Sequence, residues 1–151
     1  MVKPSIKNKF FIMFCIFTYC LVIPGCNDNN KPDIIIKDAR LYLPLKGADM
    51  AVGYLRLENN QTKKIVISSI ECKEVKASLH ETILGPEGLM KMKKLEMFTV
   101  DPESHINFKP GGKHVMFSGL KEFKESILIC NFLSITGKEI PFTLEVLTNG
   151  K

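Results

Sequence analysis

The sequence predicts an all-β domain built as a Greek-key sandwich or barrel. Short apolar or alternating segments recur along the chain, and turn residues separate them at close spacing. The chain lacks a long helical stripe of apolar residues, an internal repeat and a low-complexity tract. Many short strands joined by frequent turns are typical of sandwiches and barrels rather than of mixed folds.

The expected strands follow one another along the whole chain after residue 32. They lie at 34–36, 41–43, 50–58, 65–70, 75–80, 90–92, 114–117, 126–135 and 139–147. Between 75 and 80 apolar and polar residues alternate strictly, which is the pattern of a half-buried strand. Gly and Pro at 85–88 and at 109–112 mark two of the turns.

The start of the chain is expected to be a lipoprotein signal peptide. Three lysines without an acidic residue precede an apolar run at 10–23, which is shorter than the roughly 20 residues of a transmembrane helix. The run ends in Ile23-Pro24-Gly25-Cys26, which resembles the lipobox of bacterial lipoproteins, where the cysteine is lipidated. Pro24 departs from the usual small residue, and a plain secretory signal is the alternative. The expected organisation is a signal at 1–25, a lipidated N-terminus and linker at 26–32, and one domain at 33–151.

The charge of the exported part excludes nucleic acid as an expected partner. The formal net charge of the chain is +5, but three of the lysines belong to the signal. Their removal leaves about +2, which is no basic patch for a phosphate backbone. The remaining length fits one domain with a single core, expected as a monomer.

Two cysteines remain after the signal and Cys26 are set aside. Cys72 and Cys130 both lie in or beside β-branched strand segments. In an oxidising compartment they could form a disulfide, which requires their Cα atoms to approach within about 7 Å. Two separately buried thiols are the alternative.

Soft donor side chains recur on the expected strands. His80, Met92, His114 and Met116 bring two imidazoles and two thioethers, which suit the soft ion Cu(I). Thioethers also persist in an oxidising compartment, where thiols are lost to disulfides. His114 and Met116 are two residues apart, so a strand places both on one face near its turn. Met90 shares the strand face of Met92 and could replace it.

The other histidine and methionines are expected outside this set. His105 follows an Asp-Pro-Glu-Ser run and is expected in a solvated turn. Met97 fits a core position better, and Met50 has no polar neighbour to recruit it.

The spacing of the donor residues resembles the motif of the periplasmic copper chaperone family PCuAC. In that motif a methionine follows a histidine by twelve positions, and a His-x-Met pair begins twenty-two positions later, as in His80, Met92, His114 and Met116. The resemblance extends from about residue 36 to residue 146 and favours Met92 over Met90. Glu81 stands where the family often has a second methionine. The implied fold is a cupredoxin-like Greek-key β-sandwich of a single domain.

The same resemblance implies a non-enzymatic metallochaperone that holds one exchangeable Cu(I) ion near the surface. It implies delivery of copper to the CuA centre of a respiratory cytochrome oxidase, often alongside a Sco-type partner. Lipid on Cys26 would hold the domain to a membrane in the periplasm. The chain ends without the His- and Met-rich tail that adds a second copper site in some members, so one site is expected.

Three other kinds of protein are alternatives to a chaperone. A blue-copper electron carrier needs two His and a Cys thiolate, yet no His follows Cys130. A hydrolase needs an activated nucleophile, and no Gly-x-Ser-x-Gly elbow or recognisable triad motif occurs. A structural or interaction lipoprotein, in which the His and Met side chains merely pack, is the third alternative.

Overall fold

A computed structural model describes residues 32–44, 48–120 and 123–148 of the 151-residue chain. The predicted signal peptide, Cys26 and nearly all of the linker lie outside these described residues. The described part of the chain forms strands and turns without a helix, so the predicted all-β class is confirmed. In the same residues there is accordingly no helix with the length and apolarity needed to cross a membrane.

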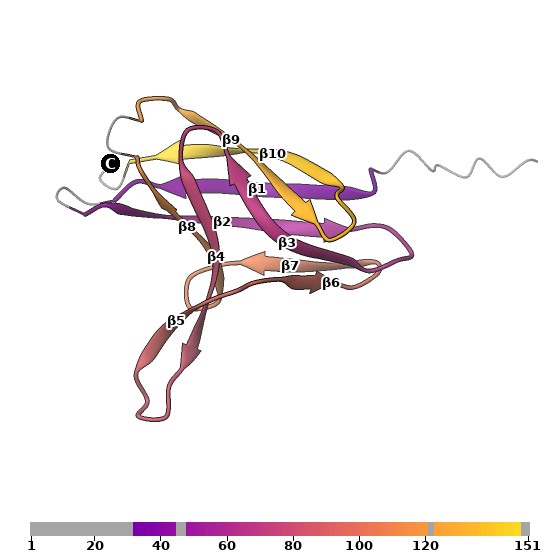
Figure 1. Ribbon diagram of the computed structural model, residues 1–151, viewed down its shortest axis with the longest axis horizontal. Coiled ribbons are helices and arrows are strands. Elements are labelled where there is room, and N and C mark those ends of the chain that lie inside the picture. The colour runs from indigo at the N-terminus through magenta and orange to yellow at the C-terminus, as the bar shows by residue number, and fades with distance from the viewer. Residues whose placement is uncertain (1–31, 45–47, 121–122, 149–151) are drawn as a thin grey trace, which may run out of the picture. The chain divides into compact units, whose positions relative to one another are not determined.

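Ten strands form in the described residues (Figure 1). Their bounds are β1 Ile34–Tyr42, β2 Met50–Asn59, β3 Ile65–Cys72, β4 Lys76–Leu84, β5 Met90–Lys94, β6 Phe98–Val100, β7 Ser104–Phe108, β8 Lys113–Ser118, β9 Ile127–Ser134 and β10 Glu139–Leu147. Hydrogen bonds join them in the order β5-β4-β8-β7-β2-β1-β10-β9-β3-β6, and β8 also pairs with β2. Most neighbours are antiparallel, whereas β1 with β10 and β7 with β8 are parallel.

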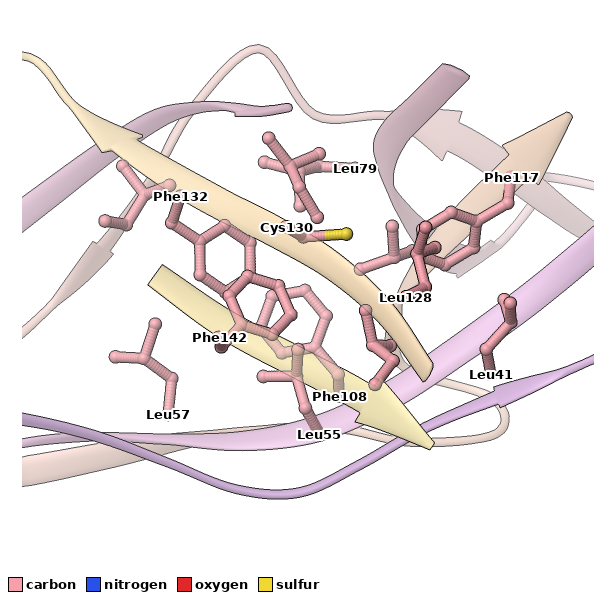
Figure 2. Packing of buried hydrophobic residues seen from close by; sticks show 14 of the residues in the cluster. Leu41, Leu55, Leu57, Leu79, Phe108, Phe117, Leu128, Cys130, Phe132 and Phe142 are labelled. Carbon is pink, nitrogen blue, oxygen red and sulfur yellow. The ribbon is translucent and has the colours of Figure 1, made fainter. Parts of the chain in front are cut away.

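Aromatic contacts show that this sheet curls over onto itself like a sandwich. Phe108 of β7 and Phe132 of β9 lie four places apart in the sheet order, yet their ring centroids are 6.2 Å apart. Phe142 of β10 stacks on Phe132 with centroids 4.7 Å apart, and Figure 2 shows these three rings gathered inside the curl. The core therefore lies between the β7 side of the sheet and the β9–β10 side.

Strand alternation sorts the residues of β2 between this core and the opposite face. Ala51, Leu55 and Leu57 are buried, whereas the residues between them are only partly covered. Gly53 lies in the buried row, where a Cβ atom would come within 2.7 Å of the Phe117 ring. A glycine here therefore lets β2 pass close to the core side of β8.

The first strand is longer than the sequence pattern indicates. Two runs at 34–36 and 41–43 were expected, but β1 is one strand whose register with β2 shifts between Lys37 and Arg40. Asp38 takes a positive φ of 52° at this irregularity, a conformation that Asp tolerates better than most residues. A β-bulge accommodates the polar residues between the two expected runs, so β1 continues through both of them.

Two short strands in the middle of the chain were missed. Residues 98–100 form β6, and residues 104–108 form β7. The expectation that His105 lies in a turn is wrong, because it pairs with Glu58 across β7 and β2. Met97 is also misassigned to the core, since its side chain is 58% exposed directly before β6. Both strands alternate, but over only three and five residues, which is too short a stretch for the pattern to stand out in the sequence.

A disulfide joins Cys72 and Cys130, which decides between the two alternatives left open for these residues. The cysteines are register partners on β3 and β9, with Cα atoms 4.1 Å apart. Cys130 is fully buried among core residues, as Figure 2 shows. The crosslink holds the end of β3, a few residues before β4 begins.

Candidate metal centre

The four predicted ligands lie on three neighbouring strands, β8, β4 and β5. Across β4 and β8, His80 is the register partner of His114, and Ser78 is the partner of Met116. Across β4 and β5, Thr82 is the partner of Met92. Residues two apart on a strand share a face, so the imidazoles and both thioethers leave the same face of the sheet. The core side of β8 is filled by Val115 and Phe117, as the alternation predicts.

His80 occupies a central position in this arrangement. It is the fifth residue of the nine-residue β4, whereas a place near the strand end was expected. The strand pairs with β8 over Lys76–Glu81 and with β5 over His80–Leu84, so His80 has a partner strand on each side. In Figure 1 the far half of β4 and all of β5 extend from the remaining strands as a hairpin.

The two imidazoles stack across the strands, and each keeps a nitrogen unused. Their ring centroids are 5.9 Å apart with an interplanar angle of 27°. His114 Nδ1–H donates to the Gly112 carbonyl at 3.0 Å, so Nε2 carries the lone pair of the neutral ring. His80 Nε2 lies 3.1 Å from Ser78 Oγ, and its Nδ1 is buried without a hydrogen-bond partner. A buried polar atom without a partner is costly, which favours a ligand at this position.

The surroundings keep His80 uncharged. Burial, followed by the neighbouring His114 and then by Lys94, lowers the pKa of His80. Lys94 is its register partner on β5, and a positive charge there disfavours an imidazolium. The next residue on β4, Glu81, forms an ion pair with Lys113, with Oε1 and Nζ 2.6 Å apart. A neutral imidazole is the form that binds metal ions.

The donor side chains differ sharply in exposure. His114 is only 5% exposed, although a position near a turn and close to the surface was expected. Met116 and His80 are half-buried, and the Met92 side chain is 64% exposed on the hairpin. Only one end of the site is therefore open to a partner.

A hollow of about 320 Å³ adjoins the imidazole pair. Its lining includes His114, Met116, Met92 and, from the start of β2, Met50. Met50 was left out of the predicted ligand set because it has no polar neighbour in the sequence. This reason is wrong, since its polar neighbour in the structure is His114, which lies on another strand. His80 does not line the hollow but borders it through His114. The sequence did hold a signal for Met50: the alternation along this strand places Met50, Val52 and Tyr54 on one face.

The donors on this face are imidazole nitrogens and thioether sulfurs. Within the described ranges no three His, Cys, Asp or Glu side chains gather as a metal site. Both cysteines in those ranges are consumed by the disulfide. Two imidazoles, each with a ring nitrogen that has no hydrogen-bond partner among the described residues, beside neutral sulfurs fit a soft monovalent ion better than a hard divalent one.

Comparison with families and curated proteins gives one match. A family model described as LpqE-like, a lipoprotein family by its description, matches residues 34–127, which is more than half of the chain. A comparison with curated proteins finds no match.

Solved structures of PCuAC domains share the fold. The copper-bound PCuAC domain from PmoF2 has a TM-score of 0.62 at 16% identity, covering 78% of this chain and 95% of that one. The apo PCuAC domain from PmoF1 has a TM-score of 0.62 at 16% identity, with 78% and 96% covered. The solution structure of apo-DR1885 from Deinococcus radiodurans has a TM-score of 0.56 at 17% identity, with 78% and 80% covered. At these identities the likeness is one of fold alone.

Proposed function

This chain belongs to the LpqE-like family of PCuAC domains, and we propose that it is a copper metallochaperone that binds one Cu(I) ion. The proposed ligands are His80, Met92, His114 and Met116. The related fold of a domain whose structure was determined with copper bound supports this proposal. So does the two-histidine, two-methionine spacing of the sequence.

The observation that carries the proposal is the imidazole pair. His114 offers Nε2 because its Nδ1 is committed to a backbone carbonyl, and His80 has a buried nitrogen that no described group satisfies. Hydrogen bonding of the second ring nitrogen is the usual way in which a protein orients a metal-binding histidine. A structural sandwich that merely packed these rings would have no need for unpaired nitrogens.

The unequal exposure of the ligands favours transfer over storage. We expect the buried His114 to hold the ion longest, while the exposed Met92 is the first ligand that a partner's donor replaces. Neutral ligands, unlike thiolates, leave the positive charge of Cu(I) uncompensated. This uncompensated charge moderates the affinity for the ion. Stepwise exchange of one ligand at a time then moves the ion without releasing it to solvent.

The proposed acceptor is the CuA centre of a respiratory cytochrome oxidase, alongside a Sco-type partner. Lipid on Cys26 would hold the domain to a membrane in the periplasm, which is the compartment that the CuA centre faces. The lipoprotein description of the family and the lipobox-like sequence before Cys26 support this location. The role proposed for the protein is binding and delivery, not catalysis.

Anaerobic competition titration with a Cu(I) chelator tests the binding proposal. His114→Ala and Met116→Ala should each weaken Cu(I) binding by at least about tenfold, since one strong donor interaction is worth about 1.4 kcal/mol or more. The circular dichroism of both variants should stay native, because both side chains lie on the face of β8 opposite the core residues Val115 and Phe117. Unchanged affinity in both variants would refute the site, and an intense blue Cu(II) form would favour an electron carrier.

A matched pair on β5 tests the choice of methionine. Met90 and Met92 have similar exposure, 62% and 64%, and lie on the same strand face. Met92→Leu should weaken Cu(I) binding, whereas Met90→Leu should leave it within about twofold of the wild type. The reverse result would show that the spacing selects the wrong residue.

Delivery needs a separate experiment. The Cu(I)-loaded chain is mixed anaerobically with an apo CuA domain, samples taken at intervals are separated into the two proteins, and the copper content of each protein is measured. We expect copper to appear in the CuA domain faster than from a Cu(I)–chelator complex of equal affinity. Equal rates would mean that this chain binds copper without delivering it there.

A further inference from the structure

A second and larger cavity lies beside the hollow that adjoins the imidazole pair. Its volume is about 740 Å³, within the range of roughly 300–1,000 Å³ that is typical of small-molecule sites. Val52 and Tyr54 of β2 line both spaces, so the two are neighbours on one face of the sheet. The lining comes from β1, β2 and the segment that ends β7.

The lining concentrates residue types that are rare in this chain. The sequence has only two arginines, Arg40 and Arg56, and both line the cavity. Of its three tyrosines, Tyr42 and Tyr54 do so as well, and their rings lie 5.8 Å apart. Arg40 and Tyr54 are register partners on β1 and β2, so their side chains leave neighbouring positions on one face of the sheet.

Among the charged and polar groups that line this cavity, cations and hydrogen-bond donors outnumber acidic groups. Lys109 joins the two arginines, and Asp38 is the one acidic residue among the lining. In the part of the chain that the structure describes, Arg40 and Lys109 make no ion pair. Burial, and then Tyr42, raise the pKa of Tyr54, so its hydroxyl stays a neutral donor.

The chemistry of the lining selects a carboxylate among anions. Arg56 already donates from Nε to the Glu58 carboxylate at 2.7 Å, which shows one lining guanidinium bound to this kind of group. Asp38 would repel a doubly charged phosphate more than a singly charged carboxylate. Val52, Pro110 and the two tyrosine rings supply an apolar wall for the body that carries the charge.

We propose that this cavity binds a carboxylate group on an apolar body, held by Arg40 and Lys109 with the tyrosine hydroxyls. Such a group could belong to a small organic acid or to an acidic side chain of a docking protein. The proposal stands without copper, since none of the four proposed copper ligands lines the cavity.

Tyrosine fluorescence gives a direct probe, because the chain contains no Trp. In the full chain carrying Tyr19→Phe, kept in mild detergent, all tyrosine emission comes from Tyr42 and Tyr54. The copper-free protein is titrated with phenylacetate, with its uncharged analogue phenylacetamide, and with inorganic phosphate. A blocked Phe-Glu dipeptide represents the acidic side chain of a protein.

We expect phenylacetate to bind saturably and phenylacetamide to bind at least about tenfold more weakly, since charged hydrogen bonds supply the difference. Arg40→Gln should cost about tenfold or more in phenylacetate affinity, and Lys109→Gln a smaller factor. Lys64→Gln removes one charge from an exposed lysine that does not line the cavity and should leave affinity unchanged. Binding should weaken as salt rises.

Tighter binding of the dipeptide would assign the group to a docking protein, and tighter binding of phenylacetate would assign it to a small acid. Either outcome supports a carboxylate site. Equal binding of the acid and its amide would overturn the proposal, as would a preference for phosphate. An equal loss in the Lys64 and Arg40 variants would also overturn it, because only overall charge would then matter.

Discussion

Removal of the disulfide should destabilise the domain strongly. Cys72 and Cys130 are separated by 58 residues, so the crosslink closes a long loop of the unfolded chain. The loop-entropy relation gives about 4 kcal/mol for a loop of this length, as an upper figure. Cys72→Ala with Cys130→Ala removes the bond without leaving buried thiols. With a urea m-value of about 2 kcal/mol/M, the unfolding midpoint should fall by about 2 M.

Urea unfolding of the oxidised wild type and of this double variant, followed by circular dichroism, measures the effect. Coincident midpoints would refute the reasoning, since they would mean that the crosslink does not restrain the unfolded chain. Cu(I) affinity provides an internal control. Neither cysteine lines the hollow that adjoins the imidazole pair, so the folded double variant should bind Cu(I) as the wild type does.

Three further predictions concern the frame that holds the site. Asn59 is fully buried and the two N–H groups of its amide are shared among three backbone carbonyls, so Asn59→Ala should cost about 2–3 kcal/mol in urea unfolding. Asn60 is only half-buried and its amide donates to one backbone carbonyl, so Asn60→Ala should cost far less, and equal losses would contradict this. Hydrogen bonds from Lys37 and then Arg56 lower the pKa of Glu58 from 4.5 to about 2. Its stabilising effect is therefore present above pH 4.5 and is lost as the pH falls towards 2, so Glu58→Gln should flatten the wild-type decline in urea midpoint over that range. Gly53→Ala should destabilise by about 1–3 kcal/mol in thermal unfolding, because its Cβ would meet a core ring at 2.7 Å, and a neutral effect would contradict that contact.

Side-chain alternation made much of the fold predictable from the sequence. The period of two along β8 assigned Val115 and Phe117 to the core, and both are fully buried. The same alternation separated Leu79 from His80 on β4. Segments with a strong alternating pattern were predictable because only one pairing register buries their apolar face.

Features that depend on sheet order were out of reach. No local pattern indicates that β2 lies beside β8, which is what brings Met50 to the hollow with His114 and Met116. The direct pairing of His80 with His114 across β4 and β8 has the same origin. Spacing along the chain selects which residues belong to a set, but the neighbouring strands decide how those residues meet.

Exposure was the weaker part of the site prediction. Turn residues before β8 indicated a position near an end of the sandwich, yet His114 is buried by strands on both sides. Burial of a strand's outer face requires cover from other strands and loops, which the local sequence does not encode in a recognisable pattern.

X-ray absorption at the copper edge of the Cu(I)-loaded protein tests the proposed ligand set most directly. We predict a first shell of two nitrogen and two sulfur neighbours, from His80, His114, Met92 and Met116. His80→Ala should remove one nitrogen and no sulfur. A wild-type shell without sulfur, or one with three sulfurs that brings in Met50, would contradict the four-residue site.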